Sequence, residues 1–146
     1  MGNICRSPLL EGWARQVLGE AGLALHLDSA GTGGWHAGSP PDPRAIAVAA
    51  RHGLDISGQR ARQVAMADFL SMDLMLCADA DNLAVLQSRR PRGASVEIAR
   101  VLDWTGVPPG GDLPDPYYGD ARDFEHANAL ARAAADGLLR RVQGRA

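Results

Sequence analysis

The chain of 146 residues carries a formal net charge of −2 at pH 7, and 46% of its residues are hydrophobic. This length fits a single domain, residues 1–146, whose core needs no disulfide or metal, and two cysteines are too few for a disulfide framework. The balanced charge argues against a nucleic-acid partner. The lack of a signal peptide or an 18-residue apolar run argues against a membrane, so we expect a cytoplasmic protein.

The first eight residues, Met-Gly-Asn-Ile-Cys-Arg-Ser-Pro, combine turn-forming residues with the start of a helix. Gly2 and Asn3 tolerate positive φ angles, Ser7 is expected to cap the helix, and Pro8 then takes its first position. Backbone N–H groups of such a loop can converge on an anion, with Arg6 as a forked donor. The stretch therefore predicts an oxyanion site.

The rest of the chain alternates segments of helical and strand periodicity. Helices are expected at residues 9–18, 45–51, 83–87 and 124–142, and strands at residues 23–30, 72–77 and 96–102. The regular alternation predicts a mostly parallel sheet with helices on both faces.

Several polar and aromatic residues allow more than one interpretation. Asp79 and Asp81 are better explained as helix caps than as metal ligands, since no further ligand lies at a suitable spacing. Arg62 is expected to be solvated or paired with acids. Trp35 follows two glycines, and it either covers a neighbouring helix or lines a pocket.

Residues 105–116 read as a loop rich in glycine and proline, which leads to Asp115-Pro-Tyr-Tyr. An acid on such a loop can reach over a bound oxyanion and protonate a leaving group. Tyr117 and Tyr118 could form the walls of a slot for an aromatic ring. Together with the oxyanion loop, these residues predict hydrolysis of an aryl phosphate.

The chain resembles the low-molecular-weight protein tyrosine phosphatases over essentially its whole length. Residues 2–8 look like the tail of that family's Cys-X5-Arg phosphate loop, and residues 28–32, 35–36, 61–63, 77–82 and 114–118 recur in matching order. The resemblance implies a flavodoxin-like three-layer α/β sandwich and a bacterial phosphomonoester hydrolase. Its substrate would be a phosphotyrosine protein or an aryl phosphate, with no metal or organic cofactor.

The resemblance also implies roles for individual residues. Arg6 would stabilise the transition state, and Asp115 would protonate the leaving phenolate and then activate water. The phosphate loop would be braced by Ser7, Asn3 and Ser29. These residues would also help to tune the thiolate of the family's nucleophilic cysteine. The residues implied to contact the substrate are Gly2, Asn3, Ile4, Cys5, Arg6, Ser7, Trp35, Tyr117 and Tyr118.

The sequence departs from the family at one decisive place. The nucleophilic cysteine should lie two positions before Gly2, and this sequence contains neither that cysteine nor the first, central strand that precedes it. Cys5 matches the second cysteine of the family's loop and is therefore not expected to be the nucleophile. Gln59 stands where some members carry a histidine that braces the loop.

Three interpretations of this departure remain open. In the first, which we favour, Met1 is an internal residue of an ordinary phosphatase. In the second, the chain is a catalytically inactive pseudophosphatase that binds phosphate or phosphotyrosine. The third, arsenate reduction, is least favoured because Cys77 alone is a poor thiol relay. For the 146-residue chain itself we expect weak or no phosphatase activity, and we expect two strand edges to be left unpaired inside the sheet. Its oligomeric state stays open.

Overall fold

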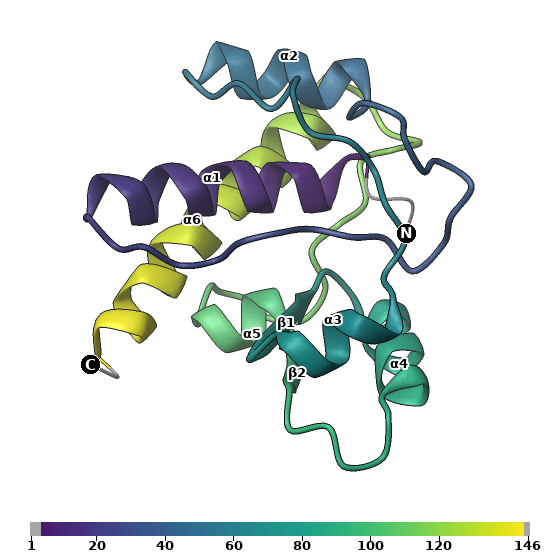
Figure 1. The fold of residues 1–146 in the computed structure, drawn as a ribbon. Helices are drawn as coiled ribbons and strands as arrows, with labels where there is room; N and C mark the ends of the chain where they lie inside the picture. Colours follow the sequence, from purple (N-terminus) through teal and green to yellow (C-terminus); the bar gives the residue numbers. More distant parts are fainter. Residues whose placement is uncertain (1–3, 145–146) are drawn as a thin grey trace.

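The computed structural model describes residues 4–144, which form six helices and two strands (Figure 1). The helices are α1 (Arg6–Glu20), α2 (Pro43–Arg51), α3 (Met66–Ser71), α4 (Ala80–Arg89), α5 (Val101–Thr105) and α6 (Ala121–Gly144), and the strands are β1 (Leu74–Cys77) and β2 (Glu97–Arg100). Among the described residues, no helix is both long enough and apolar enough to cross a bilayer.

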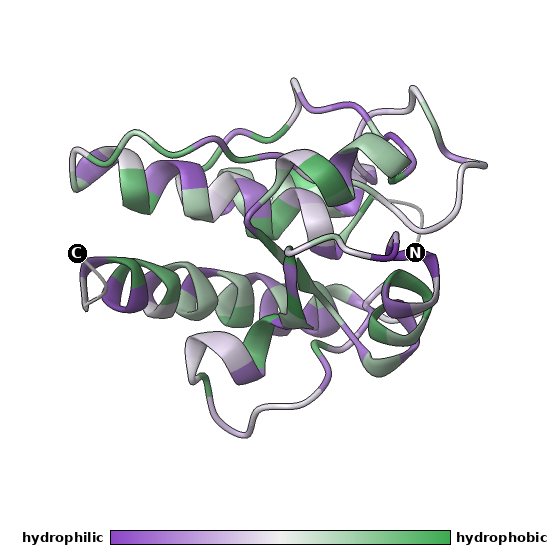
Figure 2. Cartoon of the chain, turned by 60° about the horizontal axis from the view of Figure 1, so that its bottom comes forward, coloured by the Kyte–Doolittle hydropathy of each residue, from purple (hydrophilic) through white to green (hydrophobic). Residues whose placement is uncertain are grey.

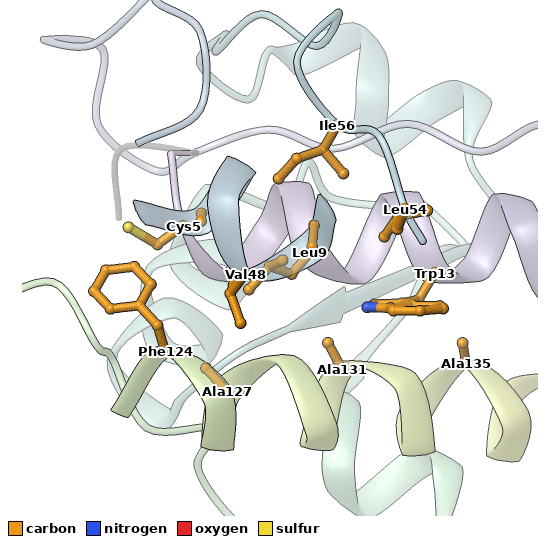
Figure 3. Close-up of a cluster of buried hydrophobic side chains, with 12 residues drawn as sticks. Cys5, Leu9, Trp13, Val48, Leu54, Ile56, Phe124, Ala127, Ala131 and Ala135 are labelled. Carbon is orange, nitrogen blue, oxygen red and sulfur yellow. The ribbon is translucent and has the colours of Figure 1, made fainter. Parts of the chain in front are cut away.

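Helices α1 and α6 pack against each other and carry the main core (Figure 3). Trp13 and Leu9 of α1 are fully buried against small residues of α6, including Ala131. The alanines let the two backbones approach closely while the large side chains of α1 fill the space between them. The indole N–H of Trp13 donates to Asn128 Oδ1 over 2.8 Å, which satisfies both buried polar groups. Trp13 is thus a core residue.

The predicted parallel pairing is present in β1 and β2, which are linked through α4. Leu74 pairs with Glu97 at one end of the ladder and Cys77 with Arg100 at the other. Figure 2 shows hydrophobic and hydrophilic residues alternating along the long helices, as expected for helices that bury one side only.

The predicted strand at residues 23–30 is not formed in the structure. This segment runs extended between α1 and the layer that contains β1 (Figure 1). Within residues 4–144, one isolated β-bridge lies at the end of this segment and joins Gly31 to Gln63. An alternating pattern favours an extended backbone, but a strand also needs a neighbour to pair with. A cavity separates this segment from β1, and Leu25 is left 45% exposed.

Helix boundaries also differ from the prediction. The first residue of α1 is Arg6, and Cys5 rather than Ser7 occupies the capping position. Pro8 is consequently the third helical residue, where its missing N–H still does no harm because the first four N–H groups have no partner within the helix. The Asp42 carboxylate accepts the Arg44 N–H over 2.8 Å, so α2 begins at Pro43.

The segment predicted as a strand at residues 96–102 divides into β2 and the start of α5. Helix α5 ends at Gly106, which adopts a φ of +73°. Asp79 caps α4 by accepting the Asn82 N–H over 2.7 Å, as predicted. The short helix α3 was not predicted.

The α5–α6 contact can be tested with one pair of glycine substitutions. A Cβ at Gly137 of α6 would collide with the backbone oxygen of Thr105, whereas a Cβ at Gly19 of α1 would meet nothing within 4 Å. We expect Gly137→Ala to destabilise the protein by about 1–3 kcal/mol through overpacking. Gly19→Ala should instead stabilise it by about 0.5–1 kcal/mol. Urea denaturation measures both, and a stabilising Gly137→Ala would contradict the packing described.

Candidate functional site

The guanidinium of Arg6 lies at the centre of the site and is only 5% exposed. Its Nη1 donates to Asp79 Oδ2 over 2.8 Å and to the Leu113 carbonyl over 2.8 Å. Asp79 follows the end of β1, and Leu113 belongs to the loop between α5 and α6. One buried charge therefore joins the start of α1, the carboxyl end of the sheet and that loop.

Asp79 is held as a carboxylate by its neighbours. Burial acts to raise its pKa, but the Asn82 N–H and the Arg6 guanidinium outweigh burial, so the pKa of Asp79 is lowered. Asp79 thus has two roles, since one oxygen caps α4 and the other binds Arg6. Sequence reasoning identified only the cap. The position of this acid, two residues after the end of an apolar strand, was the available signal for the second role.

Asp115, in the same loop as Leu113, also approaches Arg6. Its Oδ2 lies 3.8 Å from Arg6 Nη2, while its Oδ1 accepts the Tyr117 N–H over 3.1 Å. The carboxylate is partly exposed. The structure therefore brings the predicted acid and the predicted phosphate-binding arginine together, with the acid accessible to solvent.

The hydrogen bonds of Arg6 with residues 4–144 leave two of its nitrogens unused. Within the part of the chain that the structure describes, Nε and Nη2 make no hydrogen bond, while Nη1 makes two. A planar fork with free N–H groups suits two oxygens of a phosphoryl group. The predicted contacts of Gly2 and Asn3 lie outside the described residues. Ile4 is fixed by its carbonyl, which accepts the Asp42 N–H over 2.7 Å.

The thiol of Cys5 is buried in the core rather than presented to a ligand. Figure 3 shows it beside Phe124, at one end of the cluster between α1, α2 and α6. Burial, reinforced by the charges of Asp42 and Asp115, raises the pKa of Cys5 to about 12. A thiol of this kind stays protonated at neutral pH. This agrees with the prediction that Cys5 is not the nucleophile.

The three predicted aromatic walls differ in how they are held. Tyr117 and Tyr118 meet edge to face with ring centroids 4.9 Å apart, and Tyr118 is 96% exposed. The Arg44 guanidinium lies 5.5 Å from the Tyr117 ring. Trp35 is 70% exposed, and its ring lies over Gly33. The interpretation that Trp35 covers a neighbouring helix is therefore wrong, and a role as a pocket wall stays a prediction.

Two polar side chains support the beginning of α1. The Ser29 hydroxyl donates to Glu11 Oε1 over 2.7 Å, and Gln59 Nε2 donates to the Pro8 carbonyl over 3.0 Å. Gln59 thus braces the first turn of α1 at the position where some family members carry histidine. The role of Ser29 in bracing the phosphate loop stays a prediction.

No group of three or more His, Cys, Asp or Glu side chains within residues 4–144 could hold a metal ion. Arg62 pairs with Asp28 and Asp68 at 3.0 and 2.9 Å, as the sequence suggested. Ser7 and Ser29 line a cavity of about 470 Å³ that does not include Arg6 or Asp115.

Comparisons with known proteins agree on one family. A family model described as low molecular weight phosphotyrosine protein phosphatase matches residues 1–145. A low molecular weight protein-tyrosine-phosphatase of Streptomyces coelicolor is 42% identical, over 99% of this chain and 93% of its own. The crystal structure of YfkJ from Bacillus subtilis is 35% identical with a TM-score of 0.90, covering 99% of this chain and 91% of that one.

A protein tyrosine phosphatase from Entamoeba histolytica, crystallised with Hepes in its active site, has a TM-score of 0.92 to this chain. It is 29% identical, and the match covers 99% of this chain and 93% of that one. The predicted flavodoxin-like α/β fold is confirmed by these structural neighbours.

The burial of both thiols predicts slow chemical labelling. Burial raises the pKa of Cys5 to about 12 and that of Cys77 to about 11. At pH 8 each thiolate fraction is then below about 0.1%, compared with about a quarter for a free cysteine. We expect a disulfide reagent to label almost no thiol in the native protein and two thiols in guanidinium chloride. Rapid labelling of the native protein that Cys5→Ser abolishes would contradict the burial of the Cys5 thiol.

The Arg6–Asp79 pair predicts a pH-dependent contribution to stability. Folding lowers the pKa of Asp79, so the ion pair contributes fully to the free energy of unfolding at pH values above the unfolded pKa near 4. This contribution is lost as the pH falls through the pKa of Asp79 in the folded protein. We expect Asp79→Asn to cost about 2 kcal/mol at pH 7, and less as the pH falls below about 4. Urea denaturation at several pH values measures this. The control Asp81→Asn, on the exposed first turn of α4, should change little.

Proposed function

Because the chain belongs to the low molecular weight phosphotyrosine protein phosphatase family, which is a family of enzymes, we propose that Arg6 binds the phosphoryl group of a phosphotyrosine protein or an aryl phosphate. The observation that carries this proposal is the buried guanidinium itself. It is fixed on one side by Asp79 and Leu113, and its Nε and Nη2 make no hydrogen bond within residues 4–144.

Preorganisation makes this arginine suitable for binding a transition state as well as a substrate. A fixed planar donor loses little entropy when it binds two phosphoryl oxygens. In a water-poor setting its charge interacts more strongly with developing negative charge than it would in bulk water. The first turn of α1 adds N–H groups that have no partner within the helix.

Asp115 is proposed as the general acid. Its Oδ2 lies 3.8 Å from Arg6 Nη2, so a phosphate bound to Arg6 would lie beside this carboxyl group. The Tyr117 N–H holds the other oxygen and orients the side chain. A protonated Asp115 in this place can donate to the ester oxygen as the aryl group leaves.

The exposed aromatic rings are proposed to contact the aryl part of the substrate. Tyr117 and Tyr118 follow Asp115 in its loop, and Trp35 follows a glycine-rich segment. The family resemblance assigns these three residues to the rim of the pocket. Stacking of aromatic rings would favour phosphotyrosine over aliphatic phosphates.

Turnover by the purified 146-residue chain is proposed to be weak. Covalent phosphoryl transfer needs a thiolate directed at the phosphorus, and both cysteines of the chain are buried with raised pKa values. The same observation favours the second candidate function, a phosphate-binding protein that does not turn over its ligand. It argues against arsenate reduction, which needs reactive thiols. The cytoplasmic location and bacterial source stay predictions.

Binding and turnover can be measured separately on the purified chain. Titration calorimetry with tungstate and with a phosphotyrosine peptide should show binding that weakens at least about tenfold in Arg6→Ala, the loss expected for a charge-assisted hydrogen bond. Arg60→Ala is the matched control, because Arg60 is exposed and its hydrogen bonds within residues 4–144 go to backbone carbonyls. Asp115→Asn should retain tungstate binding.

Hydrolysis of p-nitrophenyl phosphate should be slow and unchanged by Cys5→Ser. Fast hydrolysis that Cys5→Ser abolishes would overturn the assignment of weak turnover. Binding that Arg6→Ala leaves intact, in a variant with an unchanged circular dichroism spectrum, would overturn the assignment of the site.

A further inference from the structure

A second arginine, Arg44, lies beside one of the proposed aromatic walls of the site. It is the second residue of α2, and the central carbon of its guanidinium lies 5.5 Å from the centroid of the Tyr117 ring and 4.6 Å from that of Phe124. Phe124 is buried in the main core, at one end of the cluster in Figure 3. A cation at this distance over an aromatic face is attracted by the ring electrons. Arg44 therefore ties the Tyr117 ring to the core.

The orientation of the Arg44 guanidinium is fixed by Asp42. Nε donates to Asp42 Oδ1 over 3.0 Å and Nη2 donates to Oδ2 over 2.9 Å, a two-pronged geometry that holds the guanidinium in one plane. Hydrogen bonding from Arg44 lowers the pKa of Asp42, so this carboxylate stays ionised at neutral pH. Because Arg44 is half-exposed, the pair contributes little to the stability of the fold. Its main consequence is the position of the guanidinium.

Asp42 is itself attached to the segment that leads into the proposed phosphate site. Its backbone N–H donates to the carbonyl of Ile4, which lies just before α1, over 2.7 Å. On the other side, the Tyr117 N–H donates to the Asp115 carboxylate. Arg44 and Asp42 thus connect the segment before α1 with the loop that carries the proposed acid.

The two adjacent tyrosines differ in how firmly they are held. Tyr117 is partly buried and packs against the main core, whereas Tyr118 is 96% exposed and meets Tyr117 edge to face. A wall whose side chain is already fixed loses little conformational entropy when a ligand packs against it. Tyr117, held by Arg44, is therefore the better wall for an aryl ring.

We propose that Arg44 is a positioning residue that sets the preference of the site for aryl over alkyl phosphoryl groups, because it holds the Tyr117 ring beside the phosphoryl group bound by Arg6. The guanidinium acts through the ring and does not touch the substrate. This inference rests on the proposed function, since it needs Arg6 to bind the phosphoryl group. It adds the residue that determines which class of phosphate ester is favoured.

Two phosphonates that cannot be hydrolysed separate the ring from the anion. Benzylphosphonate carries an aryl group and methylphosphonate does not, and titration calorimetry measures the affinity of the 146-residue chain for each. We expect benzylphosphonate to bind more tightly. In Arg44→Met the ratio of the two affinities should fall at least about threefold, the loss expected for one cation–π contact. Removal of a positive charge weakens the binding of both anions alike, so the ratio reports on the ring.

Arg51→Met is the matched control. Arg51 is the last residue of the same helix, its side chain is 53% exposed compared with 48% for Arg44, and it pairs with Glu125 of α6. This variant should keep the affinity ratio of the unmodified chain. Arg44→Gln should repeat the result of Arg44→Met, so the outcome does not depend on the folding of one variant.

The position of the ring can also be measured without a ligand. The chain contains two tyrosines, so incorporation of 3-fluorotyrosine gives two fluorine resonances, which Tyr118→Phe assigns. In Arg44→Met the Tyr117 resonance should move toward that of the exposed Tyr118. In Arg51→Met it should stay where it is.

The possible failures of this inference and of the proposed function can be told apart. An affinity ratio that Arg44→Met and Arg44→Gln leave unchanged, or a Tyr117 resonance that does not move, would overturn the role of Arg44 while leaving phosphate binding in place. A chain that binds neither phosphonate would overturn the proposed function, and the role of Arg44 in substrate preference would fall with it.

Discussion

The burial of the Arg6 charge is the constraint on which the site depends. A guanidinium that is 5% exposed needs an opposite charge and filled hydrogen bonds. Asp79 supplies the charge and Leu113 a carbonyl. Since these partners come from the end of β1 and from the loop that also carries Asp115, satisfying one charge aligns a helix, a sheet edge and a loop. The Arg6 guanidinium is therefore held in one orientation by residues of the chain itself.

The cavity of about 470 Å³ beside β1 and the proposed phosphate site are neighbours along the chain. Ser7 and Ala78 line this cavity, and the residues beside them, Arg6 and Asp79, form the ion pair. The main core lies elsewhere, between α1, α2 and α6. Side-chain packing in that cluster, rather than a wide sheet, holds α1, which carries Arg6, against α6, which follows the loop of Asp115.

Much of the architecture could be predicted from local patterns. The parallel β1–β2 pair, the long helix α6 and the cap at Asp79 follow from periodicity and side-chain chemistry. The prediction of a strand at residues 23–30 is wrong, because a strand forms only beside a neighbouring strand, and no local sequence pattern describes that neighbour. The start of α1 was misplaced by the strong capping preference of Ser7, and the first helical turn accepts Pro8 at its third position as well.

The site was predictable in its residues but not in its contacts. Arg6 and Asp115 could be selected as an anion donor and an acid, and they do lie together. That Asp79 and the Leu113 carbonyl fix Arg6 could not be predicted, since the contacts span 73 and 107 positions of the sequence. The burial of Cys5 also depends on distant residues, notably Phe124 of α6.

Arg6 is proposed to be a preformed donor to phosphate, in a chain whose Cys5 and Cys77 thiols are not directed at the ligand. A crystal structure of the 146-residue chain grown with tungstate tests this most directly. We expect tungstate oxygens within hydrogen-bond distance of Arg6 Nε and Nη2, beside Asp115, with Cys5 Sγ still packed against Phe124. Tungstate bound elsewhere, or an oxyanion in contact with an exposed Cys5 Sγ, would contradict it.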